Sequence, residues 1–426
     1  MLFQSIQRAR SSARYTAYRL IAMALAAILT PPTVAGAEDP AASMFSFSGF
    51  GTLGAVHSNE DQADFVSGIF SPNGAGYTSP WSVSVDSKIG AQIDARFTPQ
   101  ISAMIQIISQ QNYDNTYTPR VEWGNIKYEL TPELGIRIGR TVLPSFLFSD
   151  TRNVGYSNPW VRPPVEAYSL VPIDTSDGVD VSYLLHLGSW VHSLVGTYGS
   201  TSTQQPTGGN AEARRQWNIS DTIEFGSATI RIAYQRADLT LDGLHTFFGA
   251  FRQFGPQGNA LADEYDPYRK PVEFIGIGGM YNPRDWFVAG EWGGTQLHSV
   301  LGESTAWYVS GGYRLAKFTP YLTYGAVKAE SNTSDPGLNV SALPPNLAGP
   351  ASGLNAALNT ILGSIAVQNT ISVGTRWDFM RNMDLKLQYD HTRLGAGSPG
   401  TLIDLQPGFR PGSTVDLLSI AIDFVW

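Results

Sequence analysis

The sequence predicts an all-β protein: a transmembrane, antiparallel, up-and-down β-barrel of about sixteen strands. Three observations predict this class. Runs of residues alternate between apolar and polar side chains, short and long connections alternate between those runs, and no stretch beyond the N-terminal region is long and apolar enough for a spanning helix. Only a helix or a closed barrel satisfies every backbone hydrogen-bonding group in lipid, so a membrane protein without a spanning helix is expected to be a barrel. Hydrophobic residues make up 42% of the chain, which suits a barrel because only every second strand residue meets lipid.

The N-terminal region has the features of a signal peptide. Four arginines between Arg8 and Arg19 precede an apolar run at 20–29, and Ala35-Gly36-Ala37 offers a small-x-small cleavage site. The run has about ten residues, whereas a spanning helix needs roughly 20. We therefore expect residues 1–37 to be removed on export and residues 38–426 to form the barrel.

Charge and cysteine content narrow the class further. Removal of the predicted signal peptide, with its four arginines, changes the formal net charge from −8 to −12. An acidic chain without basic clusters argues against a nucleic-acid partner. The chain has no cysteine, so no disulfide holds this exported protein, and the hydrogen-bonded ladder of a barrel would serve instead.

Motifs for cofactors, metals and catalysis are weak. Residues Gly49 to Gly54 match the dinucleotide fingerprint G-x-G-x-x-G, but they lie inside a predicted strand and no helix follows, so we expect no cofactor. The six histidines are scattered, and the pair His186 and His192 brackets a tight turn, so no metal site is expected. No G-x-S-x-G motif supports a hydrolase. We predict no catalytic residues and no enzyme activity.

The strands are predicted from a two-residue period. In residues 88–97, Ile89 and Ile93 lie on one face while Lys88 and Asp94 lie on the other. A soluble β-sandwich shows the same alternation, so the period alone does not select a barrel. The predicted strands are 45–57, 81–97, 101–111, 120–130, 134–143, 178–187, 190–199, 214–226, 228–238, 273–281, 286–294, 305–315, 318–329, 369–379, 383–393 and 413–426.

The connections between these strands select the barrel. Short links at 98–100, 131–133, 282–285 and 380–382 alternate with long ones at 58–80, 144–177, 241–271 and 330–369. Short periplasmic turns on one side and long extracellular loops on the other are the rule for outer-membrane barrels. An even number of strands also returns both termini to the periplasmic side. Within the last long loop, residues 351–367 are rich in Ala and Leu, and both a short helix and a mobile segment remain open.

The C-terminal strand carries an assembly signal. Leu418, Ile420, Ile422, Phe424 and Trp426 alternate up to an aromatic final residue. This pattern resembles the terminal signature that the barrel-assembly machinery recognises in outer-membrane proteins, although the usual final residue there is Phe. Aromatic residues near strand ends predict girdles at both membrane interfaces. They are Trp123, Tyr128, Trp217, Phe225, Tyr281, Trp286, Trp307, Tyr313, Phe379 and Trp426.

Several local segments resemble porin-like proteins of proteobacteria. They are Phe47-Ser48-Gly49-Phe50-Gly51, Gly139-Arg140, Asn153-Val154-Gly155-Tyr156, Pro159-Trp160-Val161-Arg162-Pro163-Pro164 and Tyr168-Ser169-Leu170. The resemblance implies a homotrimer in the lipid of the Gram-negative outer membrane that lets small hydrophilic solutes and ions diffuse through. In position and length, residues 145–176 resemble the third loop of the general porins, which folds inward and narrows the pore.

Charged residues on the predicted inner face and on this loop form the candidate constriction. A Lys or Arg at the lipid midplane is unfavourable by about 2 to 4 kcal/mol, so charged positions are expected to face inward. Loop acids opposite basic wall residues would set a transverse field across the waterway; the alternative is that the lumen face is polar simply because it is wet. The candidate pore-lining residues are Arg96, Lys127, Arg137, Arg140, Asp150, Glu166, Asp174, Arg231 and Arg376, with Asp177 beside the loop.

Two charged residues break the pattern. Arg140 shares its parity with Ile136 and Ile138, and Asp221 shares its parity with its outward neighbour Ile219. Each requires a bulge, a place near the headgroups, or a subunit contact, and the sequence leaves these three open.

The leading functional hypothesis is therefore a passive diffusion channel. A substrate-specific channel is the alternative, and a continuous ladder of basic or aromatic side chains along the pore would favour it. An outer-membrane enzyme would need a Ser, a His and an acid grouped at one face. An adhesion barrel with a blocked lumen has the same strand pattern.

Overall fold

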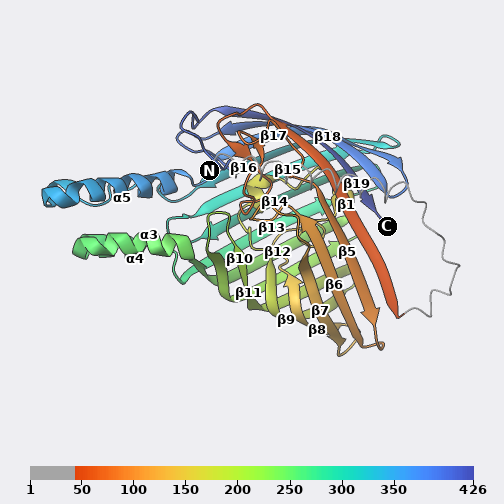
Figure 1. The fold of residues 1–426 in the computed structure, drawn as a ribbon. Coiled ribbons are helices and arrows are strands. Elements are labelled where there is room, and N and C mark those ends of the chain that lie inside the picture. Colours follow the sequence, from red (N-terminus) through yellow and green to blue (C-terminus); the bar gives the residue numbers. More distant parts are fainter. Residues whose placement is uncertain (1–43) are drawn as a thin grey trace.

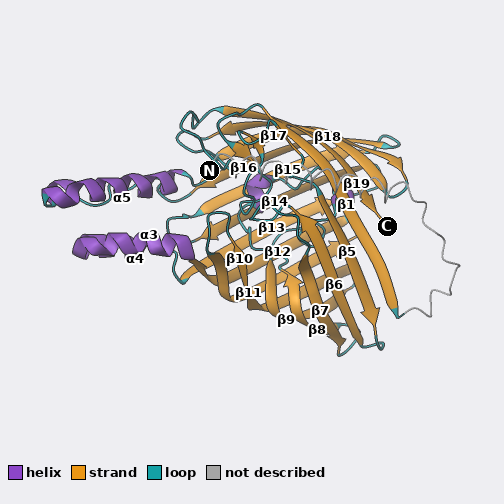
Figure 2. Cartoon of the chain, viewed as in Figure 1, coloured by secondary structure: helices purple, strands orange, loops and turns teal. Residues whose placement is uncertain are grey.

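The computed structural model describes residues 44–426, which form a closed antiparallel barrel of 16 long strands (Figures 1 and 2). Each barrel strand pairs with its neighbours in sequence, and the last strand closes the barrel by pairing with the first. The predicted fold class is confirmed. The predicted signal peptide, residues 1–37, lies outside the described residues.

All sixteen predicted strands are present. The first eight are β1 (Phe45–Ser58), β5 (Lys88–Arg96), β6 (Ile101–Gln110), β7 (Arg120–Glu129), β8 (Leu134–Val142), β9 (Thr175–Leu187), β10 (Trp190–Gln204) and β11 (Asn210–Phe225). The others are β12 (Ala228–Leu241), β13 (Lys270–Tyr281), β14 (Trp286–Gln296), β15 (Ser304–Tyr313), β16 (Phe318–Ala329), β17 (Gln368–Met380), β18 (Met383–Leu394) and β19 (Thr414–Val425).

The predicted strand 81–97 was partly wrong. Only β4 (Trp81–Ser82), which pairs with β1, and β5 are extended there, and residues 83–87 turn into the barrel. The turn buries Val85 in an apolar cluster and brings Asp86 to an arginine of the inner loop. Two further short strands, β2 (Asp64–Phe65) and β3 (Ala75–Gly76), pair with each other in the same β1–β5 connection.

The connections differ at the two ends of the barrel, as predicted. One end has the tight turns 97–100, 130–133, 188–189, 226–227, 282–285, 314–317 and 381–382. The other has the loops 59–87, 111–119, 143–174, 205–209, 242–269, 297–303, 330–367 and 395–413. Each two-residue turn contains a residue in the left-handed backbone region: Gly188 has φ 64°, Gly226 has φ 57° and Asn382 has φ 62°.

The closing seam between β1 and β19 explains the glycine motif of the first strand. A Cβ on Gly49 would lie 2.0 Å from Cζ2 of Trp426, and a Cβ on Gly51 would lie 2.4 Å from Cζ of Phe424. The glycines therefore make room for the two aromatic rings that end the chain. The strand predicted as the assembly signal forms this seam, with Leu418 and Ile420 exposed on the outer surface; its recognition by assembly machinery stays a prediction.

The outer surface of the barrel is apolar and ends in aromatic pairs. Exposed aliphatic side chains alternate along the strands, with Ile126 58% and Ile138 62% exposed. Near the tight turns the aromatic rings of neighbouring strands touch, as Trp190 and Phe225 do at 4.6 Å between centroids. Exposed members of the predicted girdles include Tyr128, Tyr281, Trp286, Trp307, Tyr313 and Trp426. This arrangement suits a lipid-facing surface bounded by two interfaces.

Two helical loops project side by side from the long-loop end (Figures 1 and 2). One holds α3 (Asp242–Phe251), η2 (Arg252–Phe254) and α4 (Gly255–Tyr265), and the other holds η3 (Val340–Ala342) and α5 (Pro345–Gly363). We call them together the helical lobe. They share an apolar core that includes Phe248, Phe251, Leu358 and Leu362.

The sequence did not predict the helices at 242–265. The segment 351–367, for which a helix and a mobile segment were both left open, is helical as far as Gly363, where the 19-residue helix α5 ends. Among the residues that the structure describes, no helix is long and apolar enough to cross a membrane.

Candidate functional site

The connection between β8 and β9, residues 143–174, folds into the barrel. It contains η1 (Gly155–Ser157) and α2 (Val165–Tyr168), and α2, the short yellow helix among the strands in Figure 1, lies against β14, β15 and β16. We call residues 143–174 the inner loop; they correspond to the predicted constriction loop 145–176. Trp160 is 1% exposed, packs edge-on against Tyr308 and donates from Nε1 to the Ser310 hydroxyl at 2.8 Å.

An aromatic cluster fixes one half of the inner loop to the wall formed by β13–β16. Phe146 stacks on Tyr168 at 4.6 Å and meets Phe274 edge-on at 5.2 Å. Tyr168 and Tyr308 both donate hydrogen bonds to the buried Glu291 carboxylate at 2.8 Å. The buried rings stabilise the packing of the loop against the wall, and the tyrosine hydroxyl groups keep hydrogen-bond partners when they are buried.

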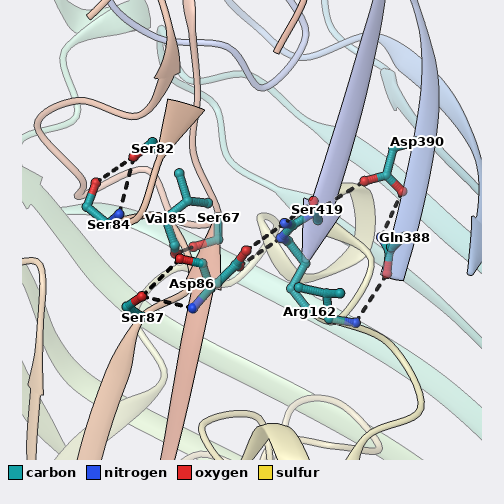
Figure 3. Close-up of polar contacts among 12 residues, drawn as sticks. Ser67, Ser82, Ser84, Val85, Asp86, Ser87, Arg162, Gln388, Asp390 and Ser419 are labelled. Atoms are coloured by element: carbon teal, nitrogen blue, oxygen red, sulfur yellow. Dashed lines mark hydrogen bonds and ion pairs between the residues drawn. The ribbon is translucent and has the colours of Figure 1, made fainter. Parts of the chain in front are cut away.

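Arg162 fixes the centre of the inner loop (Figure 3). Its guanidinium makes two hydrogen bonds to Asp86, at 2.9 and 2.7 Å, and one to Asp390 at 3.3 Å. It also donates to the Ser419 hydroxyl at 2.7 Å, and only 7% of it is exposed. Burial lowers the pKa of Arg162, but the carboxylates of Asp86 and Asp390 together raise it by more, so the net pKa lies above its ordinary value. The residue therefore stays charged and ties the loop to β18, β19 and the chain before β5.

Glu166 does not line a waterway as the sequence predicted. It is 2% exposed, and its Oε1 accepts hydrogen bonds from Gln368 Nε2 at 2.8 Å and from the Thr370 hydroxyl. Burial raises the pKa of this carboxyl group. Glu166 is placed between the inner loop and β17, where it anchors the loop.

Arg376 also contacts the inner loop rather than facing it across open space. Its Nη1 donates to the carbonyl oxygens of Tyr156 and Asn158 at 2.5 and 3.3 Å, and its guanidinium lies 4.6 Å from the Tyr156 ring centroid. Beside it, the fully buried Lys386 donates to the Gly155 carbonyl at 2.6 Å. Parity along β17 correctly predicted an inward side chain, but it could not predict that the loop rests on this wall.

Four of the predicted residues meet at a cavity on the opposite wall. It measures about 280 Å³, and we call it the inner cavity. Its charged lining residues are Lys127, Arg137 and Arg231 on the wall and Asp150 on the inner loop. The other lining residues are Val142, Pro144, Ser182, Ser193, Val195 and Thr222.

Each cation of the inner cavity has one acidic partner. Arg137 forms a two-bond pair with the buried Asp180, both bonds being 2.9 Å. Arg231 reaches Asp150 at 2.9 Å, and Lys127 reaches Glu129 at 2.7 Å.

A second, larger cavity of about 710 Å³ lies toward the long-loop end, and we call it the outer cavity. The predicted residues Asp174 and Arg140 line it. Asp174 pairs with Arg152 at 2.6 Å, and Arg140 makes two hydrogen bonds of 2.7 Å to Asp177. The charged residues around it are Asp86, Lys88, Asp114, Arg120, Glu122, Arg140, Arg152, Arg162 and Asp174. Arg96 lines neither cavity; it is exposed at the tight-turn end of β5.

The two residues that broke the charge pattern are both paired. Arg140 follows Gly139, whose φ of 132° marks an irregular backbone, and lies close to the end of β8 beside its cross-strand partner Asp177. Asp221 is half-buried and hydrogen-bonded to His192 Nδ1 at 2.8 Å. His192 therefore has an acidic partner that the sequence did not identify.

Within residues 44–426 no group of three or more His, Cys, Asp or Glu could hold a metal ion. His192, His245 and His391 each meet an aspartate. In that same range, no hydrogen bond joins a histidine to a Ser or Thr hydroxyl.

Comparison with known proteins finds likeness in structure only. No protein-family model matches the chain, and no curated protein matches it. The barrel aligns with OmpF of Salmonella typhi in complex with daunomycin at a TM-score of 0.54 and 11% identity, covering 90% of this chain and 97% of that one. It aligns with the outer-membrane channel DcaP of Acinetobacter baumannii at 0.53 and 11%, covering 92% and 100%. The anion-selective porin of Comamonas acidovorans gives 0.53 and 10%, covering 90% and 99%.

At these identities the likeness concerns the fold alone. The chain has the fold of the outer-membrane porins and channels, and the resemblance predicted from its sequence is confirmed at that level.

Proposed function

We propose that this protein is an outer-membrane channel through which small hydrophilic solutes and ions diffuse passively. The proposal rests on the asymmetry of the lumen, in which the inner loop fills one side and charged cavities lie on the other. The inner loop is anchored to the wall β13–β19, and the charged inner and outer cavities lie beside the loop along β5–β12. A barrel of about sixteen strands is too wide for its own side chains to fill, so the loop narrows the lumen from one side.

The two cavities share the inner loop as a boundary. Asp150 borders the inner cavity, while Arg152 and Asp174 border the outer one. A solute that moves between the two ends would pass this loop and meet charges of both signs. Selection by size and charge at such a constriction follows from the local field and the limited space.

The rest of the proposal follows from this role. The apolar outer surface would lie in outer-membrane lipid, with the long loops outside the cell and the tight turns in the periplasm. Residues 1–37 would direct export, and β19 would engage the barrel-assembly machinery. We further propose a homotrimer, as the resemblance of the sequence to porins implies.

Single-channel recording tests the proposal. The mature protein, refolded and inserted into a planar bilayer, is expected to give stable current steps in KCl and to pass small sugars in a vesicle-swelling assay. A barrel that resists heat in detergent, inserts into the bilayer and passes no current would contradict the channel function. Chemical cross-linking in detergent that gives only monomers would contradict the trimer.

A further inference from the structure

The inner cavity has the chemistry of an anion site. Its wall places Lys127 and Arg137 directly opposite each other on β7 and β8, and Arg231 on β12. Asp150 is the one carboxylate among its lining residues. Asp180, Glu129 and Asp150 together balance the three cations formally, but of these acids only Asp150 lines the space.

The uncharged lining groups add hydrogen-bond donors. The Thr222 hydroxyl oxygen accepts from Arg231 Nε at 2.9 Å, which leaves its proton free to donate. The Ser193 hydroxyl makes no hydrogen bond within residues 44–426. Lys127 uses one of its three N–H groups on Glu129. The cavity therefore offers more donors than acceptors, which favours an oxyanion over a cation.

Asp150 already occupies the place that such an anion would take. It belongs to the inner loop, 52% of its side chain is exposed, and one hydrogen bond to Arg231 Nη2 holds it. Two other N–H groups of Arg231 donate to the Thr222 hydroxyl and to the Phe146 carbonyl, so this side chain cannot turn away from the cavity without losing both hydrogen bonds. A carboxylate or phosphate from solution can accept the same hydrogen bond from the Arg231 guanidinium, which its other hydrogen bonds already hold in position.

We propose that the inner cavity is a binding site for small oxyanions, carboxylate or phosphate, and that Asp150 is a built-in carboxylate which a passing anion displaces from Arg231. The solute class rests on the proposed channel function, whereas the site itself does not. The volume of about 280 Å³ holds one such ion with some water, since a water molecule takes about 30 Å³. The channel would then pass anions preferentially and hold oxyanions briefly.

Inorganic phosphate is the probe that tests the site. In planar bilayers, phosphate added to KCl is expected to reduce the chloride current of the wild type in a saturable way. Lys127→Gln removes a donor whose side-chain hydrogen bond within residues 44–426 is to Glu129 and not to the inner loop. This substitution is expected to raise the half-blocking phosphate concentration about fivefold. Asp150→Asn removes the built-in carboxylate and is expected to lower that concentration.

Lys328→Gln is the matched control. Lys328 is 70% exposed and lines neither cavity, so its loss removes the same charge elsewhere. Block that is equal in the wild type and in Lys127→Gln would overturn the site. So would phosphate that has no effect on an intact chloride current.

Calorimetry separates failure of the site from failure of the channel. Titration of the detergent-folded full barrel with phosphate is expected to show binding in the wild type and weaker binding in Lys127→Gln, whether or not current flows. Binding without current would contradict the channel function and leave the site standing. Absence of binding in the wild type would overturn the site.

Discussion

At the residue scale, the glycines of β1 are required by the rings that close the barrel. Gly51→Val would drive its side chain into the Phe424 ring, whose nearest atom lies 2.4 Å from a Cβ placed there. Such overpacking is expected to destabilise the barrel by about 1 to 3 kcal/mol. Urea unfolding in lipid micelles, followed by tryptophan fluorescence, measures the change.

Gly196→Val on β10 is the matched control, because a Cβ there meets nothing within 4 Å. Equal stability losses in the two variants would show that the seam has no special need for glycine.

Arg162 holds the inner loop through buried charge. Arg162→Met leaves Asp86 and Asp390 buried without their cation, and removal of one partner from a buried pair is expected to cost about 3 to 5 kcal/mol. The same substitution at Arg214, whose side chain is 60% exposed in its pair with Glu212, should cost about 1 kcal/mol or less. Urea midpoints compare the two variants, and a loss at Arg162 no larger than at Arg214 would contradict the anchor.

Glu166 gives a pH dependence whose sign follows from its burial. Burial raises the pKa of the Glu166 carboxyl group above its ordinary value of 4.5, so the folded state favours the protonated form. The contribution of Glu166 to the free energy of unfolding is therefore complete below pH 4.5, where the carboxyl group is protonated in both states. That contribution is lost as the pH rises through the raised pKa of the folded state. Glu166→Gln, which keeps the acceptor oxygen for Gln368 and Thr370, is expected to remove this dependence.

The measurement is stability against pH for the wild type and Glu166→Gln, with the exposed Glu224→Gln as control. Identical pH profiles of the wild type and Glu166→Gln would contradict a buried carboxyl group at this position.

At the element scale, the two parts of the helical lobe stabilise each other. Leu239 pairs with Lys270 and Val327 pairs with Gln368 at the base of the two loops, so a short linker can replace either one without disturbing the barrel. Removal of 243–265 alone would expose the apolar face of α5. We expect rapid protease cleavage within α5 in that variant, and a protease-resistant barrel when 331–366 is removed as well.

Limited proteolysis of barrels reconstituted in vesicles compares these deletions with the wild type. An α5 that resists cleavage equally well with and without its partner would contradict the shared core.

The helices α3 and α4 of the helical lobe were not predicted from the sequence. Strands such as β5 and β18 could be predicted because one face must be apolar in lipid, which imposes a strict two-residue period. Helices α3 and α4 are short and contain glycine, and their stability comes from contacts with α5 about a hundred residues later in the chain. Local pattern carries no information about such a partner.

At the scale of the whole molecule, the sequence indicated which loop enters the barrel but not the wall on which that loop rests. Lys127, Arg137, Arg231 and Asp150 line one cavity, and their role in a constriction stays a prediction. Arg162 was missed as an anchor because its partners Asp86 and Asp390 are 76 and 228 residues away. The local signal that could have indicated it is a single arginine in the apolar, proline-bounded stretch 159–164.

Replacement of residues 146–170 by a short Gly-Ser linker tests whether the anchored inner loop narrows the channel, when the single-channel conductance of this variant is compared with that of the wild type. The linker removes Arg162 and the inner-loop members of the aromatic cluster together, so these anchors no longer hold a loop in the lumen. A conducting wild type and a clearly larger conductance in the variant are the result that a channel narrowed by an anchored loop predicts. Equal conductance in the two proteins, with both barrels folded and inserted, would contradict it.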